Sequence, residues 1–176
     1  MPEAVCRLRA YNLQVPDFPT GFATGMNLIA PLITPDTTLL DVSFTSKKKL
    51  FEHAAELFAR THALKTSDIF TSLFERERLG STALGHGIAI PHGRIKGLKE
   101  ASGAFYRLKT PLEFDAPDNL PVSLCFILLV PQDANERHLQ ILGELAQLFG
   151  DDAMRAKMLA AAAPHDLIAL LGAWTS

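Results

Sequence analysis

The residues with the clearest chemical potential lie in one stretch, 77–94, which reads ERLGSTALGHGIAIPHGR. Its short apolar run, 88–90, leads into Pro91-His92-Gly93, and this order predicts one imidazole at the end of a strand. Proline fixes its own φ and favours extended geometry in the residue before it, so His92 should occupy a defined position. The glycines before it can expose several backbone N–H groups, which suits an anion. Taken alone, such a histidine could also be an ordinary surface imidazole.

A longer pattern runs through the same stretch: an acidic or amide residue, six residues, apolar-Gly, two residues, then apolar-Ala-apolar-Pro-His-Gly. Glu77, Leu84-Gly85 and 88–93 satisfy it. The pattern resembles the phosphorylation-site signature of enzyme IIA domains of the bacterial phosphotransferase system, in the fructose/mannitol/nitrogen class (EIIA type-2). The resemblance implies that His92 accepts a phosphoryl group from the phosphohistidine of a phosphocarrier protein. It also implies a mixed β-sheet sandwiched between α-helices, the mannitol-type IIA fold.

The resemblance points to two more residues. In the family, the arginine before the glutamate of the motif lies near the active histidine, and Arg76 holds that position; a guanidinium there could stabilise the transferring charge. Family members also carry a second histidine before Leu-x-x-Leu, which His138 matches in HLQIL. It is expected to bind the phosphoryl group or to set the tautomer of His92. Without the resemblance, a solvated charge run and a histidine at a helix start would explain both residues.

Three residues around the motif are candidates for phosphate binding. Ser81 and Thr82 lie in the glycine-rich loop and could donate hydrogen bonds to a phosphoryl group, although turns favour Ser and Thr in any case. Gly93 has no side chain, so a phosphate could come close to its backbone. The resemblance implies a transfer that needs no metal or other cofactor, and no HxxxH, CxxC or paired-carboxylate pattern stands out against this expectation.

Composition narrows the class of protein. The 176 residues suit one domain with a substantial core, and 48% hydrophobic with 20% charged residues is ordinary for a soluble protein. The net charge of −2 argues against nucleic acid or a membrane surface as the main partner. The two cysteines, Cys6 and Cys125, do not indicate a disulfide framework, so a cytoplasmic location is expected. The longest apolar run, 124–130, is too short to span a bilayer.

Strand and helix patterns alternate along the chain, which predicts an α/β fold. Residues 1–25 are interpreted as an irregular leader that need not be native, and 26–176 as the IIA domain. The second helix should begin at a Ser67 cap and deliver Arg76 to the glycine-rich loop. Strands are expected at 38–42, 101–108 and 121–131, the last one buried on both faces. Helices are expected at 45–62, which Thr45 or Ser46 could cap, and at 133–149, 151–163 and 166–174. The inner face of 133–149 is expected to consist of Leu139, Leu142, Leu145, Ala146 and Phe149.

The sequence ends without a transporter domain, which favours the nitrogen-regulatory branch of the family. The resemblance implies that a protein of this branch is a regulator, and that its phosphorylation state determines which proteins it binds, such as transporters or kinases. A separate IIA subunit that passes phosphate to a sugar-specific IIB protein remains an alternative. A binding module that works without phosphorylation is a hypothesis of another class, and the presence of His92, Arg76 and His138 together argues against it. A metal-dependent hydrolase would need carboxylates near His92, which the sequence does not supply.

Overall fold

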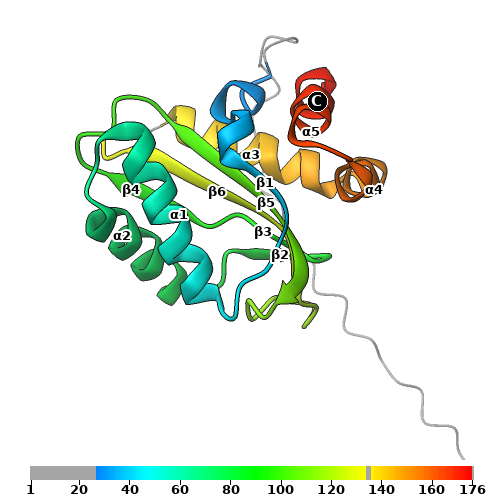
Figure 1. The fold of residues 1–176 in the computed structure, drawn as a ribbon, viewed down its shortest axis with the longest axis horizontal. Coiled ribbons are helices and arrows are strands. Elements are labelled where there is room, and N and C mark those ends of the chain that lie inside the picture. Colours follow the sequence, from blue (N-terminus) through cyan, green and yellow to red (C-terminus); the bar gives the residue numbers. More distant parts are fainter. Residues whose placement is uncertain (1–26, 134–135, 176) are drawn as a thin grey trace, which may run out of the picture.

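The computed structural model of the protein describes residues 27–133 and 136–175; the leader expected at 1–25 lies outside them. In the described residues a six-stranded sheet has the order β1-β5-β6-β3-β2, and β4 pairs with β6 as well (Figure 1). The strands are β1 (Thr38–Val42), β2 (Ala83–Gly85), β3 (Ile88–Ala89), β4 (His92–Ile95), β5 (Ser102–Leu112) and β6 (Val122–Pro131). The sheet is mixed, because β6 pairs antiparallel with β5 but parallel with β3 and β4.

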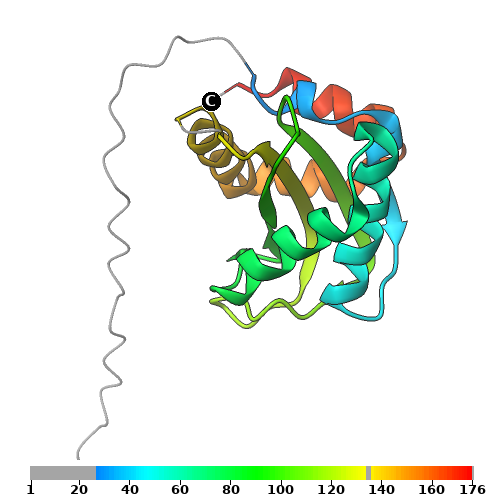
Figure 2. The same cartoon turned by 90° about the vertical axis from the view of Figure 1, so that its left-hand side faces the viewer.

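Helices cover both faces of this sheet. The α-helices are α1 (Lys47–His62), α2 (Thr66–Arg78), α3 (Glu136–Gly150), α4 (Asp152–Ala160) and α5 (Pro164–Ala173), and two 3-10 turns, η1 (Ala30–Leu32) and η2 (Pro35–Thr37), precede β1. Helices α1 and α2 lie on one face, and α3, α4 and α5 lie on the other (Figures 1 and 2). The α/β class and the sheet sandwiched between helices are therefore confirmed. No helix among the described residues is long and apolar enough to cross a membrane.

Strand β6 lies between the two layers of helices and packs against both of them. Its side chains alternate between the two hydrophobic clusters, so that Ile127 packs under α1 and α2 while Phe126 and Leu128 pack under α3 and α5. A strand with both faces covered needs apolar residues at successive positions, which explains its continuous apolar run. The prediction of an interior strand at 121–131 is confirmed.

The predicted side-chain cap is found at the first helix but not at the second. Ser46 caps α1 through its side chain, which accepts a hydrogen bond from the backbone N–H of Lys49. The Ser67 cap is wrong, because α2 already begins at Thr66, and the hydroxyl of Ser67 donates to Asp68 instead.

The inner face predicted for the helix at 133–149 is also only partly correct. Leu139 is 58% exposed, and Ala146 is exposed. The buried positions of α3 are His138, Ile141, Leu145, Leu148 and Phe149. Several apolar residues of α3 are adjacent in the sequence, so two different faces of the helix could be taken as the apolar one. The face that contains His138 packs against the sheet.

Candidate active site

His92 lies next to the central strand, but at the start of a strand and not at the end of one. Ile88 pairs with Leu124 and His92 with Leu128, so β3 and β4 follow β6 in one continuous register. Pro91 interrupts them because it has no N–H to donate, yet its carbonyl still accepts a hydrogen bond from the N–H of Leu128 at 2.9 Å. The proline thus separates two short strands and leaves the backbone of His92 fixed on both sides.

The imidazole of His92 is held through both ring nitrogens. Nδ1 lies 2.9 Å from the carbonyl oxygen of Ile90, and the Nε–H of Arg76 donates to Nε2 at 3.1 Å. A carbonyl can only accept, so Nδ1 carries the proton, and Nε2 has the lone pair. In this tautomer, Nε2 is the nucleophilic nitrogen.

The surroundings of His92 favour its neutral form. Burial lowers the pKa of the imidazole below its ordinary value of 6.5, and the positive charge of Arg76 acts in the same direction, although the hydrogen bond to the Ile90 carbonyl opposes them. A neutral imidazole is the form that can attack phosphorus. These surroundings therefore favour the form of the imidazole in which Nε2 carries a lone pair.

Arg76 is itself held in place. It lies in the last turn of α2, and besides the bond to His92 its Nη1 donates to the carbonyl of Gly80 at 3.0 Å. The guanidinium is therefore tied both to the imidazole and to the loop that follows the helix. A cation fixed beside Nε2 can stabilise negative charge that arrives there.

The second histidine approaches from the other layer of helices. His138 is in the first turn of α3 and is buried, and its ring centroid lies 6.3 Å from that of His92. Helix α2 and helix α3 cover opposite faces of the sheet, so the two layers meet at His92. The structure thus brings together His92, Arg76 and His138, which the sequence separates by up to 62 positions.

The three remaining candidates make contacts within the protein. The hydroxyl of Ser81 donates to the carbonyl of Phe114, and that of Thr82, which is buried, donates to Glu77 at 2.6 Å. Gly93 lies under α2, where a Cβ would come within 2.6 Å of the hydroxyl oxygen of Ser72. Its lack of a side chain is therefore needed for the helix to pack closely on β4, whether or not a phosphate approaches it.

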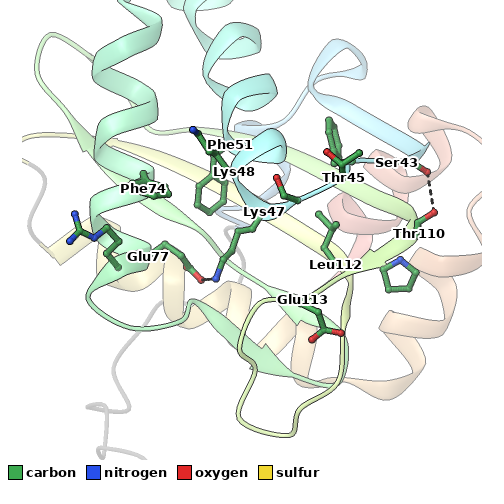
Figure 3. Close-up of a pocket in the computed structure, with 14 residues that line it drawn as sticks. Ser43, Thr45, Lys47, Lys48, Phe51, Phe74, Glu77, Thr110, Leu112 and Glu113 are labelled. Atoms are coloured by element: carbon green, nitrogen blue, oxygen red, sulfur yellow. Dashed lines mark hydrogen bonds and ion pairs between the residues drawn. The ribbon is translucent and has the colours of Figure 1, made fainter.

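An ion pair between a partly exposed lysine and a buried glutamate lies next to the site and was not predicted from the sequence. Lys47, in the first turn of α1, contacts the carboxylate of Glu77 at 3.0 Å (Figure 3). Its ammonium also lies over the ring of Phe114. Both charged residues line a cavity of about 960 Å³ between the start of α1, the end of α2 and the end of β5. Glu77 belongs to the signature, but the identity of its cation, 30 positions earlier, could not be read from any local pattern.

Comparison with known proteins shows which family the sequence matches. Residues 31–173 match the family model described as "Phosphoenolpyruvate-dependent sugar phosphotransferase system, EIIA 2". The chain belongs to this family. The match covers most of the chain and includes every residue of the site.

Relatives within the EIIA type-2 family bear related names. A "Nitrogen regulatory protein" of Pseudomonas aeruginosa is 40% identical over 131 residues, 74% of this chain and 85% of that protein. The protein of the same name from Escherichia coli is 36% identical over 144 residues, 81% of this chain and 88% of the relative.

Solved structures agree in fold. The "Nitrogen Regulatory Protein IIA-Ntr" of Neisseria meningitidis has a TM-score of 0.79 and 46% identity, and the alignment covers 82% of this chain and 99% of that one. The IIA mannitol protein of Escherichia coli, at 18% identity, shares the fold with a TM-score of 0.67 over 79% of this chain and 98% of its own. The mannitol-type IIA fold that the sequence implied is thus confirmed.

Proposed function

We propose that this chain is a nitrogen-regulatory IIA protein that accepts a phosphoryl group on Nε2 of His92 from a cytoplasmic histidine phosphocarrier. The observation that carries the proposal is the pair of bonds to the imidazole: Nδ1–H to the Ile90 carbonyl, and Nε2 toward Arg76. A neutral imidazole whose Nδ1–H is hydrogen-bonded has one nitrogen, Nε2, with a lone pair that can attack, and here a cation lies beside that nitrogen.

In the proposed step, the lone pair of Nε2 forms a bond to phosphorus as the phosphorus–nitrogen bond of the donor phosphohistidine breaks. The bonding pair returns to the donor ring, which becomes neutral. The ring of His92 keeps the proton on Nδ1 and takes up the positive charge, which strengthens its bond to the Ile90 carbonyl. No external proton is needed, and the loose transition state requires mainly alignment and charge stabilisation.

Arg76 has to change partners during this step. Once Nε2 bonds to phosphorus it has no lone pair to accept a hydrogen bond, so the N–H groups of Arg76 turn to the phosphoryl oxygens. His138 lies close enough to His92 for its ring to act as a second phosphoryl partner. We assign Ser81, Thr82 and Gly93 a supporting part: the hydroxyls of Ser81 and Thr82 hold the glycine-rich loop, and Gly93 lets α2 pack closely on β4 beside His92.

The regulatory branch is favoured by the relatives that match over most of their length, which are named nitrogen regulatory proteins at 36–40% identity. Transfer to a sugar-specific IIB protein is the second candidate. It is supported by a relative named "PTS system fructose-specific EIIA component" from Haloferax volcanii, 39% identical over 90 residues. In the regulatory account, phosphorylation changes which proteins bind the chain, and phosphate is not passed on to a cysteine-bearing IIB.

The test is reconstitution with phosphoenolpyruvate, enzyme I and the nitrogen-branch phosphocarrier, read by intact mass. Wild type should gain one acid-labile phosphoryl group, and His92→Ala should gain none. His86→Asn is the matched control, because His86 is exposed in the same loop and Asn tolerates its positive φ of 54°. A folded wild type that takes up no phosphate beside a working control acceptor would refute the proposal and favour a phosphorylation-independent binding module.

A further inference from the structure

Glu77 is a buried carboxylate that accepts hydrogen bonds on both oxygens. Its side chain is 5% exposed. Lys47 donates to Oε1 at 3.0 Å, while the backbone N–H and the hydroxyl of Thr82 donate to Oε2 at 3.0 and 2.6 Å (Figure 3 shows the Lys47 contact). Burying a carboxylate is costly unless it is paired and hydrogen-bonded, and here both conditions are met.

Hydrogen bonds continue from Glu77 to the protonated side of the imidazole. The carbonyl of Thr82, the residue that Glu77 fixes, accepts the N–H of Ile90 at 3.0 Å. The carbonyl of Ile90 in turn accepts from Nδ1 of His92 at 2.9 Å. Each link is short and involves backbone groups, so a shift of Thr82 would move the acceptor that determines which nitrogen of His92 carries the proton.

Glu77 also acts on the other side of the imidazole. It follows Arg76 directly in the last turn of α2, and its backbone carbonyl accepts the N–H of Gly80 at 3.2 Å. The carbonyl of Gly80 accepts from the guanidinium of Arg76. The backbone of residue 77 therefore holds the loop that bonds Arg76, while its carboxylate holds Thr82 and, through Thr82, the acceptor for Nδ1.

We propose that Glu77, neutralised by Lys47, is a positioning residue for phosphoryl acceptance: through Thr82 and Ile90 it holds His92 in the tautomer that leaves Nε2 free. Neither side chain of the pair touches the phosphoryl group in this proposal. The inference rests on the proposed function, since it concerns how that reaction is made possible. It assigns a role to Lys47, which lies outside the signature and on the helix farther from His92.

The charge of the pair matters as well as its shape. A carboxylate only accepts hydrogen bonds, so both oxygens can serve Lys47 and Thr82 at once, whereas an amide would have to turn its NH₂ toward one of these donors. Burial disfavours the charged ammonium of Lys47, but hydrogen bonding to Glu77 and to Asp115 outweighs it and raises the pKa of Lys47. Lys47 thus stays charged and keeps the carboxylate partnered.

The experiment compares Glu77→Gln and Lys47→Met with wild type in two readouts. Long-range proton–nitrogen NMR of the unphosphorylated protein reports the tautomer of His92, and initial rates report phosphoryl acceptance. Lys48→Met is the matched control, because Lys48 is the next residue of α1 and its side chain is 62% exposed. Lys47→Arg keeps the charge and should rescue the rate.

We expect Glu77→Gln and Lys47→Met to mix the two tautomers and to slow acceptance by ~10- to 100-fold, the size of effect that a displaced reacting group produces. Lys48→Met and Lys47→Arg should keep the wild-type tautomer and rate. Should Glu77→Gln fail to fold, Lys47→Met carries the test alone. Folded variants with wild-type tautomer and rate would overturn the inference.

These outcomes are separable from a failure of the proposed function. If wild type takes up no phosphate, the function is wrong, yet the tautomer of His92 in the variants still shows whether Glu77 positions it. If wild type takes up phosphate and all variants match it in rate and tautomer, the function stands and the positioning role is wrong.

Discussion

The two helical layers are joined to the sheet by different kinds of contact. Helices α1 and α2 add polar links near the site to their apolar packing: Arg76 to His92, Glu77 to Thr82, and the hydroxyl of Ser72 to the carbonyl of Arg94. The layer of α3, α4 and α5 packs mainly through aliphatic and aromatic side chains. Its main polar tie is Arg107 of β5, which donates to Asp41 and to three carbonyls at the end of α4.

This difference predicts which substitutions should change the reaction rate and which should change only the stability of the fold. In the first layer, Arg76 bonds the imidazole itself and Glu77 bonds Thr82, whose carbonyl holds Ile90, so changes at these two residues should alter reactivity. In the second layer, the polar tie lies among the ends of α4 and β1, and changes there should alter folding only. His138 is the exception, because it reaches the site from the second layer.

The largest effect is expected at Arg76. Arg76→Met removes the cation beside Nε2 and should slow phosphoryl acceptance by ~100- to 1000-fold, the usual cost of losing a preorganised group that stabilises transferring charge. Initial rates from the phosphorylated phosphocarrier measure this. Arg78→Met, an exposed arginine of the same helix, serves as the control, and equal rates for the two variants would contradict the role of Arg76.

Arg107 tests the opposite half of the comparison. Arg107→Leu leaves the carbonyls of Met158, Leu159 and Ala161 without their donor, which should lower the free energy of unfolding by about 2–3 kcal/mol. Chemical denaturation measures the loss. The acceptance rate per folded molecule should stay at the wild-type value, and a slower rate would show that the two layers are not separable in this way.

Two glycines of the sheet sharpen the comparison, because each lies under a different layer. A Cβ on Gly103 would come within 2.6 Å of the ring of Phe126, and one on Gly93 would come equally close to the hydroxyl of Ser72. Each change to Ala should lower the free energy of unfolding by about 1–2 kcal/mol. Only Gly93→Ala should also slow acceptance, since it displaces α2 from β4 beside His92; the same slowing in Gly103→Ala would argue against the distinction.

The smallest effect concerns pH. Because burial and the charge of Arg76 lower the pKa of His92 below 6.5, more than half of the imidazole should be neutral at pH 6.5, and protonation should become dominant only at lower pH. Titration of the His92 ring by NMR gives the value. The same titration of the protein unfolded in denaturant is the reference, and a folded pKa at or above the unfolded one would contradict this description of the site.

Local signals in the sequence predicted much of the fold. The strand Thr38–Val42 and the Ser46 cap were correct because a strand pattern and a side-chain cap depend on nearby residues. The face of α3 was misread because its sequence offers two apolar stripes, and only packing on β6 decides between them. The strand break before His92 was missed because the pairing that resumes after Pro91 depends on β6, which comes 30 residues later.

The site shows the same limit. His92, Arg76 and His138 could be predicted because a family signature marks their positions. Lys47 could not, since its partner Glu77 becomes its neighbour only when α1 packs beside α2. The hydroxyls of Ser81 and Thr82 suit a phosphate by residue type alone, and only the fold shows that Phe114 and Glu77 already accept their hydrogen bonds.

Phosphoryl acceptance on Nε2 of His92 can be tested by locating the phosphoryl group on the ring. Nitrogen-15-labelled protein, phosphorylated through the phosphocarrier, would be examined by long-range proton–nitrogen and phosphorus NMR. Phosphorus is expected on Nε2 of His92, with the proton retained on Nδ1. Phosphorus on Nδ1, or on another residue, would contradict it.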